Sequence, residues 1–151
     1  MKVEAKLKEM GIELKELPKS VFPIERTKTA CGLTFVSGHG TNILGKVGAD
    51  LTLEDGYKAA REAAINCINA IKDAAGDLDK VNIVKVFGMV NSAPDFVDQP
   101  KVINGVSDLL IEVFGQEKGS HARSAVGMGS LPRGIACEVE MVVEILEWYL
   151  T

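Results

Sequence analysis

The clearest periodic pattern along the chain is a stripe of small apolar residues that recurs every three or four positions between residues 54 and 75. This spacing predicts an amphipathic helix, because residues three or four apart share one helix face. Gly76 follows directly and suits a C-terminal cap. The small side chains predict close packing against a sheet. The stripe consists of Ala60, Ala63, Ala64, Cys67, Ile68, Ile71 and Ala74.

Two further stretches also have helical spacing. Residues 2–10 carry apolar residues three or four positions apart and are followed by Gly11, which predicts a short N-terminal helix. Residues 97–114 predict a longer helix with Pro100 in its first turn and Gly115 at its end.

Alternation of apolar and polar positions predicts the strands. Residues 12–17 fit a short first strand, and residues 26–37 fit a hairpin. Residues 81–90 predict a strand on which Val84 and Val86 share one face with a glycine.

Residues 121–147 predict a second hairpin, which would place Arg123 opposite a strand with alternating glutamates. Glu138 and Glu140 are two residues apart and point to one face, roughly 6.5 Å apart along the strand. Two interpretations of Arg123 remain open at this point. It could neutralise Glu138 or Glu140 across the hairpin. Alternatively, it could hold a ligand carboxylate while a glutamate positions or deprotonates a water.

The resulting order, β-β-α-β-α-β-β, predicts one α+β domain over residues 1–151, with two helices on one face of a sheet. Residues 1–20 would form an N-terminal extension that contains the short helix. The other sheet face would keep apolar residues such as Val142 and Leu146. An apolar uncovered face predicts symmetric self-association.

Composition narrows the possible partners and location. The net charge of -4 gives no electrostatic reason to bind nucleic acid or an anionic membrane. No apolar run approaches the ~20 residues of a membrane span, and the charged N-terminus lacks the apolar core of a signal peptide. A cytoplasmic protein is expected. Its three widely spaced cysteines, Cys31, Cys67 and Cys137, predict reduced thiols and no metal site.

Other candidate residues have weaker patterns around them. His39 and His121 lie in loop-like sequence, where each could line a cleft or face solvent. Ser124 has no His and Asp pattern around it, so a nucleophilic role is not expected. The segment 38–50 contains four glycines and predicts a loop, but it lacks the Gly-Lys-Ser/Thr ending of a phosphate loop.

Three short runs follow one another towards the C-terminus: Ala122-Arg123-Ser124, Leu131-Pro132 and Glu138-Val139-Glu140. Together they resemble the signature of the Rid family of reactive intermediate deaminases, also called YjgF-like proteins. The similarity covers about residues 22–147. It includes the run at 35–38 and Asn104, which lies where the family places an asparagine in its second helix.

The resemblance implies a chorismate-mutase-like fold and a homotrimer with sites in the clefts between neighbouring subunits. Deaminating members hydrolyse 2-imino and enamino acids to 2-keto acids and ammonia, without metal or organic cofactor. By this resemblance Arg123 binds the substrate carboxylate and Glu138 orients the attacking water. The other positions expected at the substrate are Gly38, Asn104, Ala125 and Glu25.

The chain departs from the deaminating members at two places, which indicates a divergent subgroup. Ala125 stands where many of them have a cysteine, and Phe22-Pro23-Ile24-Glu25 stands where they place a tyrosine. These changes keep an alternative open, a non-catalytic module that binds small carboxylate metabolites. Nuclease activity, attached to some members, is not favoured by the acidic charge and the scarcity of aromatic residues.

Overall fold

The structure is a computed structural model that describes residues 2–20 and 23–147. Its helices and strands follow one another in the predicted order, which confirms the α+β fold class. Two short 3-10 turns, Leu78–Lys80 and Pro132–Gly134, precede the third and the fifth strand. In chain order the main elements are α1 (Lys2–Glu9), β1 (Thr27–Ala30), β2 (Leu33–Gly40), α2 (Leu53–Ala75), β3 (Val81–Asn91), α3 (Gln99–Gly119), β4 (Ala122–Met128) and β5 (Cys137–Ile145).

The five strands form one sheet in the order β1-β2-β5-β3-β4. The predicted hairpin over residues 121–147 is therefore wrong, because β4 pairs in parallel with β3 and β5 lies between β2 and β3. Burial explains the central position of β5: Cys137, Val139, Met141 and Val143 all point into the core. α2 packs over this strand, so its apolar face is buried in the core.

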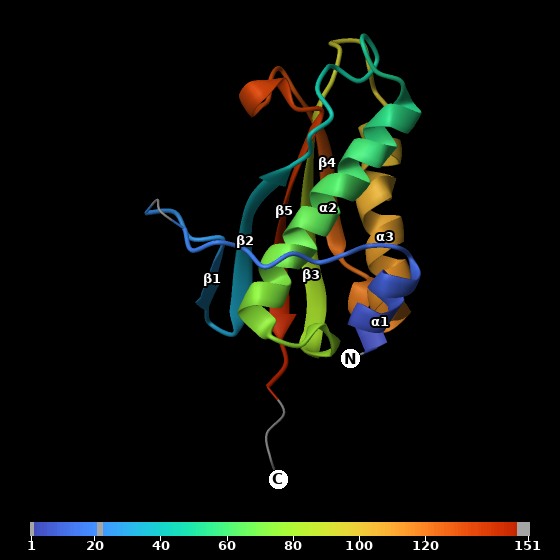
Figure 1. Cartoon of the computed structure of the whole chain (residues 1–151). Coiled ribbons are helices and arrows are strands. Elements are labelled where there is room, and N and C mark those ends of the chain that lie inside the picture. Colours follow the sequence, from blue (N-terminus) through green and yellow to red (C-terminus); the bar gives the residue numbers. More distant parts are fainter. Residues whose placement is uncertain (1, 21–22, 148–151) are drawn as a thin grey trace.

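α2 and α3 lie side by side on one face of this sheet, as Figure 1 shows. The predicted alanine stripe of α2 is buried, except that Ala74 in the last turn is exposed. Thr52 begins the helix with a capping box, in which its side chain and that of Asp55 each accept from the other's backbone N–H. Gly76 ends the helix at φ 71, as predicted.

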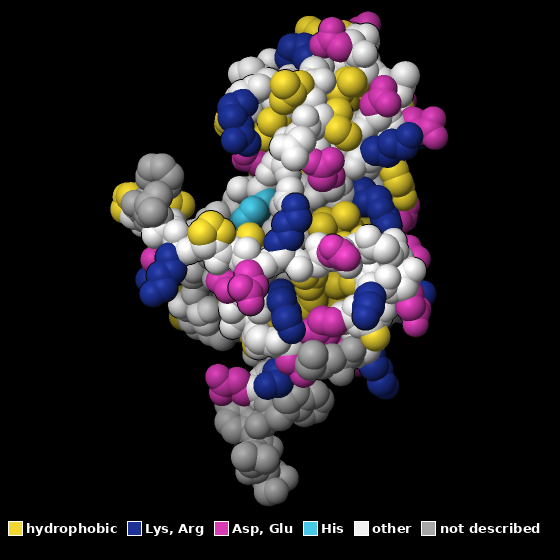
Figure 2. Space-filling model, in the orientation of Figure 1, with side chains coloured by type: hydrophobic (Ala, Val, Ile, Leu, Met, Phe, Trp, Pro, Cys, Tyr) yellow, Lys and Arg dark blue, Asp and Glu magenta, His cyan; other side chains and the backbone are white. Residues whose placement is uncertain are grey.

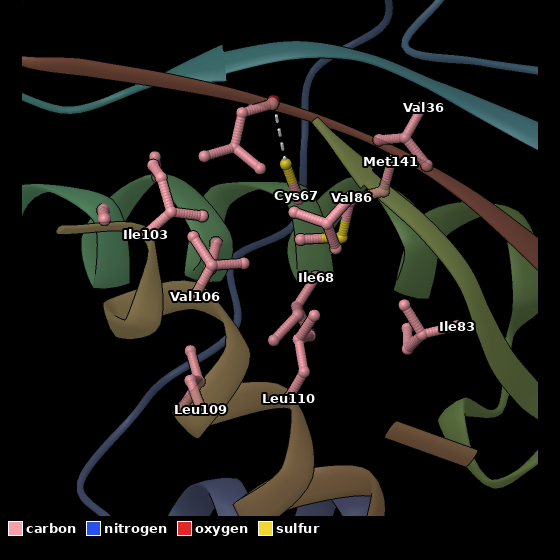
Figure 3. Packing of buried hydrophobic residues seen from close by; sticks show 14 of the residues in the cluster. Val36, Cys67, Ile68, Ile83, Val86, Ile103, Val106, Leu109, Leu110 and Met141 are labelled. Carbon is pink, nitrogen blue, oxygen red and sulfur yellow. Dashed lines mark hydrogen bonds between the residues drawn. The ribbon is translucent and has the colours of Figure 1, made fainter. Parts of the chain in front are cut away.

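The core lies between the helices and the sheet, and Figure 3 shows Ile68 of α2 beside Leu110 of α3. Cys67 donates its thiol hydrogen to the carbonyl oxygen of Val139 at 3.3 Å. Burial raises the pKa of the Cys67 thiol far above its ordinary range and that of Cys137 to about 12. Both cysteines are free and lie in the core.

Three local predictions need correction. Residues 12–17 form no strand; this segment crosses over α2 and its Lys15 N–H donates to the side chain of Asn69 at 3.0 Å. The predicted loop 38–50 begins later, because β2 continues to Gly40. Val84 does not share a face with Val86, since the register shifts between Ile83 and Lys85. A bulge of this kind turns one side chain out of the alternation.

The third helix lies where the sequence predicted it, but it begins two residues later, at Gln99, and continues past Gly115 to Gly119. Pro100 lies in its first turn, and Gly115 interrupts the helical backbone at φ 82 before one more turn to Gly119. Gly105 lets α3 approach α2 closely, because a Cβ at this position would lie 2.2 Å from the carbonyl oxygen of Tyr57.

The second face of the sheet carries no helix in the described part of the chain (Figure 1). It holds the half-exposed Phe35 and a hollow of about 410 Å³ beside Phe87, Glu140 and Val142. We call it the open face. Its apolar character was predicted from β5.

Candidate functional site

Arg123 is held at the outer edge of the sheet by residues of α3. It pairs in the ladder with Val86, which is buried beneath the helices, so the Arg123 side chain lies on the helix-covered side. Its Nη1 donates to Asn104 Oδ1 at 2.9 Å and to Ser107 Oγ at 3.1 Å. Its Nη2 donates to the carbonyl of Pro100 at 3.4 Å. The structure thus brings Arg123 and Asn104 together.

The charge of Arg123 has no internal counter-charge. All three of its acceptors are neutral, and no carboxylate within residues 2–20 and 23–147 forms an ion pair or hydrogen bond with it. The interpretation in which Arg123 neutralises Glu138 or Glu140 is therefore wrong within one chain. A half-buried guanidinium held by neutral groups keeps its capacity to bind an anion.

His121 supports this arrangement indirectly. Its Nδ1 lies 2.6 Å from the carbonyl oxygen of Gly119, so Nδ1 carries the proton and Nε2 is an acceptor. Ser107 can then donate its hydroxyl hydrogen to Nε2, at 2.9 Å, while it accepts from Arg123. The sequence analysis did not identify Ser107. Its position three residues after Asn104, on the same helix face, was the available signal.

Glu138 lies on the open face, next to the end of β2. Its ladder partners are Gly40 and Met89, and its neighbour Val139 points into the core. Gly38 allows this packing, because a Cβ at that position would lie 2.8 Å from Glu138 Oε2. Glu138 has no hydrogen bond or ion pair with any other described residue. Its carboxylate is thus available to a ligand or water.

The other residues predicted to contact substrate lie either near Arg123 or near Glu138. Glu25 lies beside the Gly38 end, where its carbonyl accepts from the Ser37 hydroxyl at 2.6 Å. Ala125 follows Arg123 along the same side of β4 and packs partly against the core. Phe22 lies outside the described residues. Gly38, Glu138 and Glu25 form one group, and Arg123, Asn104 and Ala125 form the other.

Within one chain the two groups are separated. β4 and β5 are two strands apart, and the registers of Arg123 and Glu138 differ by three residues. These offsets correspond to about 10 Å across the sheet and about 10 Å along it. The two side chains also lie on opposite faces, so one small molecule cannot contact both within a single chain.

His39 lies on the helix-covered side of β2, where it pairs with the buried Val139. Its Nδ1 lies 2.6 Å from the Ser37 carbonyl oxygen. Burial lowers the pKa of His39 and the positive charge of Arg26 lowers it further, against the opposing effects of the Ser37 bond and Glu138. His39 is therefore a neutral, partly buried ring near pH 7.

One cluster has the spacing of metal ligands among the described residues, namely Glu4, Asp77 and Asp79 near α1. Its carboxylates already accept backbone N–H groups of Leu78, Asp79, Lys2 and Val3. This cluster fastens α1 to the domain and lies apart from Arg123 and Glu138.

Two further observations concern nucleic acid and membranes as possible partners. On the helix side, Figure 2 shows Lys and Arg interspersed with Asp and Glu, without one continuous basic area. None of the described helices combines the length and apolarity needed to cross a bilayer.

The five-stranded sheet with two helices on one face is the chorismate-mutase-like fold. The sequence profile described as "YjgF/chorismate mutase-like, putative endoribonuclease" matches residues 4–145. This chain belongs to that family, which confirms the resemblance noted from its motifs.

Several relatives match almost the whole chain. Protein TCP17 of Trypanosoma cruzi is 40% identical, over 95% of this chain and 94% of its own length. A protein of unknown function from Agrobacterium tumefaciens is 36% identical, with 95% and 92% of the two chains covered and a TM-score of 0.87. A Shewanella oneidensis protein described as a "putative endoribonuclease" is 30% identical, with 96% and 100% covered and a TM-score of 0.89.

Proposed function

We propose that this chain forms a homotrimer whose inter-subunit clefts hydrolyse 2-imino acids, and their enamine tautomers, to 2-keto acids and ammonia. The observation that carries the proposal is the uncompensated charge of Arg123, held in place by Asn104, Ser107 and Pro100. Such a fixed guanidinium suits the carboxylate of an amino-acid-sized substrate.

In the proposed trimer, Arg123 of one subunit lies near Glu138 of the neighbouring subunit. Arg123 lies at the β4 edge and Glu138 lies on the open face. When the open face of one subunit packs near the β4 edge of its neighbour, a cleft forms with Arg123 on one wall and Glu138 on the other. In this arrangement one ligand can contact both Arg123 and Glu138, whereas within a single chain it cannot.

The proposed chemistry needs only these two charged groups. Arg123 holds the substrate carboxylate, and Glu138 takes a proton from a water that attacks C2 of the protonated imine. A carbinolamine forms, and the proton passes from Glu138 to its nitrogen. Ammonia then leaves as the C–N bond breaks, and loss of the hydroxyl proton gives the 2-keto acid. Protonated imines are already electrophilic, so orientation supplies most of the required acceleration.

A non-catalytic module that binds small carboxylate metabolites is the second candidate. Ala125 favours it, because an alanine side chain offers no hydrogen-bonding group at that position. In this case Arg123 would bind a 2-keto acid tightly while imine hydrolysis stayed at the uncatalysed rate.

Keto acid release from 2-aminoacrylate generated in situ tests the first candidate. Wild type should exceed the uncatalysed background, and Arg123→Ala should return to that background while its oligomeric mass stays unchanged. Equal rates for wild type and background would reject the deaminase. Calorimetry with a 2-keto acid would then measure the binding alternative.

A pair of glutamate variants tests the role of Glu138. Glu140 is the next residue on the same face and provides a matched control. Glu138→Gln should lower kcat at least tenfold, because an amide cannot accept the water proton. Glu140→Gln should leave kcat within about twofold. Similar losses in both variants would contradict the specific role of Glu138.

A further inference from the structure

A second polar hollow, of about 210 Å³, lies on the helix side of β2 beneath the segment that crosses α2. It is separate from Arg123 and Asn104. Its wall combines two arginines, a histidine and two buried polar side chains: Arg26, Arg133, His39, Thr41 and Asn69. Leu17 of the crossing segment contributes an apolar part.

Neither arginine has an acidic partner among residues 2–20 and 23–147. Arg26 donates to the carbonyl oxygen of Pro18, which is neutral. Arg133 makes no hydrogen bond or ion pair within residues 2–20 and 23–147. The half-buried Arg26 and the exposed Arg133 both line the hollow, and no carboxylate lines it. In a chain with net charge -4, this makes the hollow a local positive site.

Uncharged donors complete the wall. Asn69 is 8% exposed, and its Oδ1 accepts from the Lys15 N–H. Its side-chain NH2 group can therefore donate to a ligand. Thr41 is 3% exposed; its Oγ1 accepts from the Ile43 N–H, so its hydroxyl hydrogen remains available. His39 is not one of these donors: its Nδ1 faces the Ser37 carbonyl oxygen, so Nε2 of the neutral ring is an acceptor and donates only when the ring is protonated.

The backbone of Arg133 is also unusual. Its φ is 59, in the left-handed region that favours glycine over residues with side chains. Arginine at such a position bears a conformational cost that glycine would avoid. Strained residues of this kind gather at functional sites, where the side chain has a use.

We propose that this hollow binds a small oxyanion, namely the phosphate or carboxylate group of a metabolite. The planar guanidinium groups of Arg26 and Arg133 match the paired oxygens of either group. Asn69 and Thr41 donate to the remaining oxygens. The site lies on the opposite side of β2 from Glu138, so its occupation does not depend on the proposed imine hydrolysis.

The two histidines of the chain provide separate reporters for the two sites. His39 lines this hollow, whereas His121 contacts Ser107 beside Arg123. In the full-length protein, the histidine ring NMR signals are followed while inorganic phosphate or acetate is added at constant ionic strength. We expect a saturable shift of the His39 signal with at least one anion. A response to phosphate alone would assign phosphate, and a response to acetate would assign a carboxylate.

Variants test whether the arginines carry the binding. Arg133→Gly removes the guanidinium, and glycine suits the left-handed backbone at this position. The variant should therefore fold normally and bind the anion at least tenfold more weakly. Arg26→Gln should do the same independently. Arg123→Ala is the matched control and should leave the His39 response unchanged. The proposal is overturned if His39 shows no saturable response to either anion, or if the response survives Arg133→Gly and Arg26→Gln but not Arg123→Ala.

Discussion

Gly38 and Gly105 both permit close contacts, but the contacts differ in kind. A Cβ at Gly105 would lie 2.2 Å from the carbonyl oxygen of Tyr57, which belongs to the backbone of α2. A Cβ at Gly38 would meet the end of the Glu138 side chain, which can move. One glycine therefore sets the spacing of two helices, and the other leaves space for a candidate functional group.

Gly105→Ala should destabilise the fold by about 1–3 kcal/mol or more, because α2 and α3 would have to separate. Gly129→Ala is the control, since a Cβ there meets nothing within 4 Å. Its effect should be about 0.5 kcal/mol or less. Urea unfolding measures both free energies. Equal values for the two variants would contradict the close helix approach.

At the scale of elements, α1 is fastened to the domain by carboxylates. Glu4 accepts from Lys72 at 2.7 Å and from the Leu78 N–H at 3.1 Å. Asp79 accepts from the Lys2 and Val3 N–H groups at 2.8 and 2.9 Å. Burial acts to raise the pKa of each carboxyl, but the hydrogen bonds to the charged form outweigh it and lower both values.

These lowered pKa values predict that α1 docking weakens in acid. A carboxyl with a depressed folded-state pKa contributes stability above its unfolded pKa and loses it as the pH falls through the folded pKa. The ordinary values are 4.5 for Glu4 and 3.8 for Asp79, so the loss should begin below about pH 4.5. Protection of α1 amides from hydrogen exchange, corrected for the intrinsic rates, should fall between pH 6 and pH 3.

A matched pair of variants separates this effect from general acid destabilisation. Glu4→Gln should weaken the protection of α1 already at pH 6, because a neutral amide interacts less strongly with Lys72. Glu9→Gln, at an exposed position of the same helix, should leave it unchanged. If both variants behave like wild type at pH 6, Glu4 does not fasten the helix.

At the scale of the whole molecule, the sheet has one covered and one open face. Phe35 remains 50% exposed on the open face, beside the hollow that Phe87 and Val142 line. Apolar area of this kind favours association. The proposed trimer covers the open face and brings Arg123 and Glu138 into one cleft.

Phe35→Glu should shift the mass from trimer towards monomer, because it places a charge in the proposed interface. Val97 provides the control, as an exposed apolar residue (78%) in the turn before α3. Val97→Glu should keep the trimer. Light scattering after gel filtration measures the mass, and circular dichroism checks the fold. A trimeric Phe35→Glu variant that retains full activity would contradict this interface.

The sequence by itself determined the order of the main helices and strands and the family. The stripe between 54 and 75 gave α2, Gly76 and Gly115 marked helix ends, and residues 26–37 gave the first hairpin. These features follow from local spacing and backbone preference, which short stretches of chain express on their own. The motif around Arg123 and Glu138 pointed to the YjgF-like family, which the profile match confirms.

Only the tertiary structure decided which strands pair and which side chains meet. Local alternation placed Arg123 opposite Glu138, but β5 lies between β2 and β3 and leaves the two residues on opposite faces. The same holds for the bulge at Val84, the contact of Ser107 with Arg123 and the presence of Arg26 and Arg133 in the wall of one hollow. Strand order depends on how all the strands together bury their apolar faces beneath the helices, and that burial is a property of the assembled core rather than of any single segment.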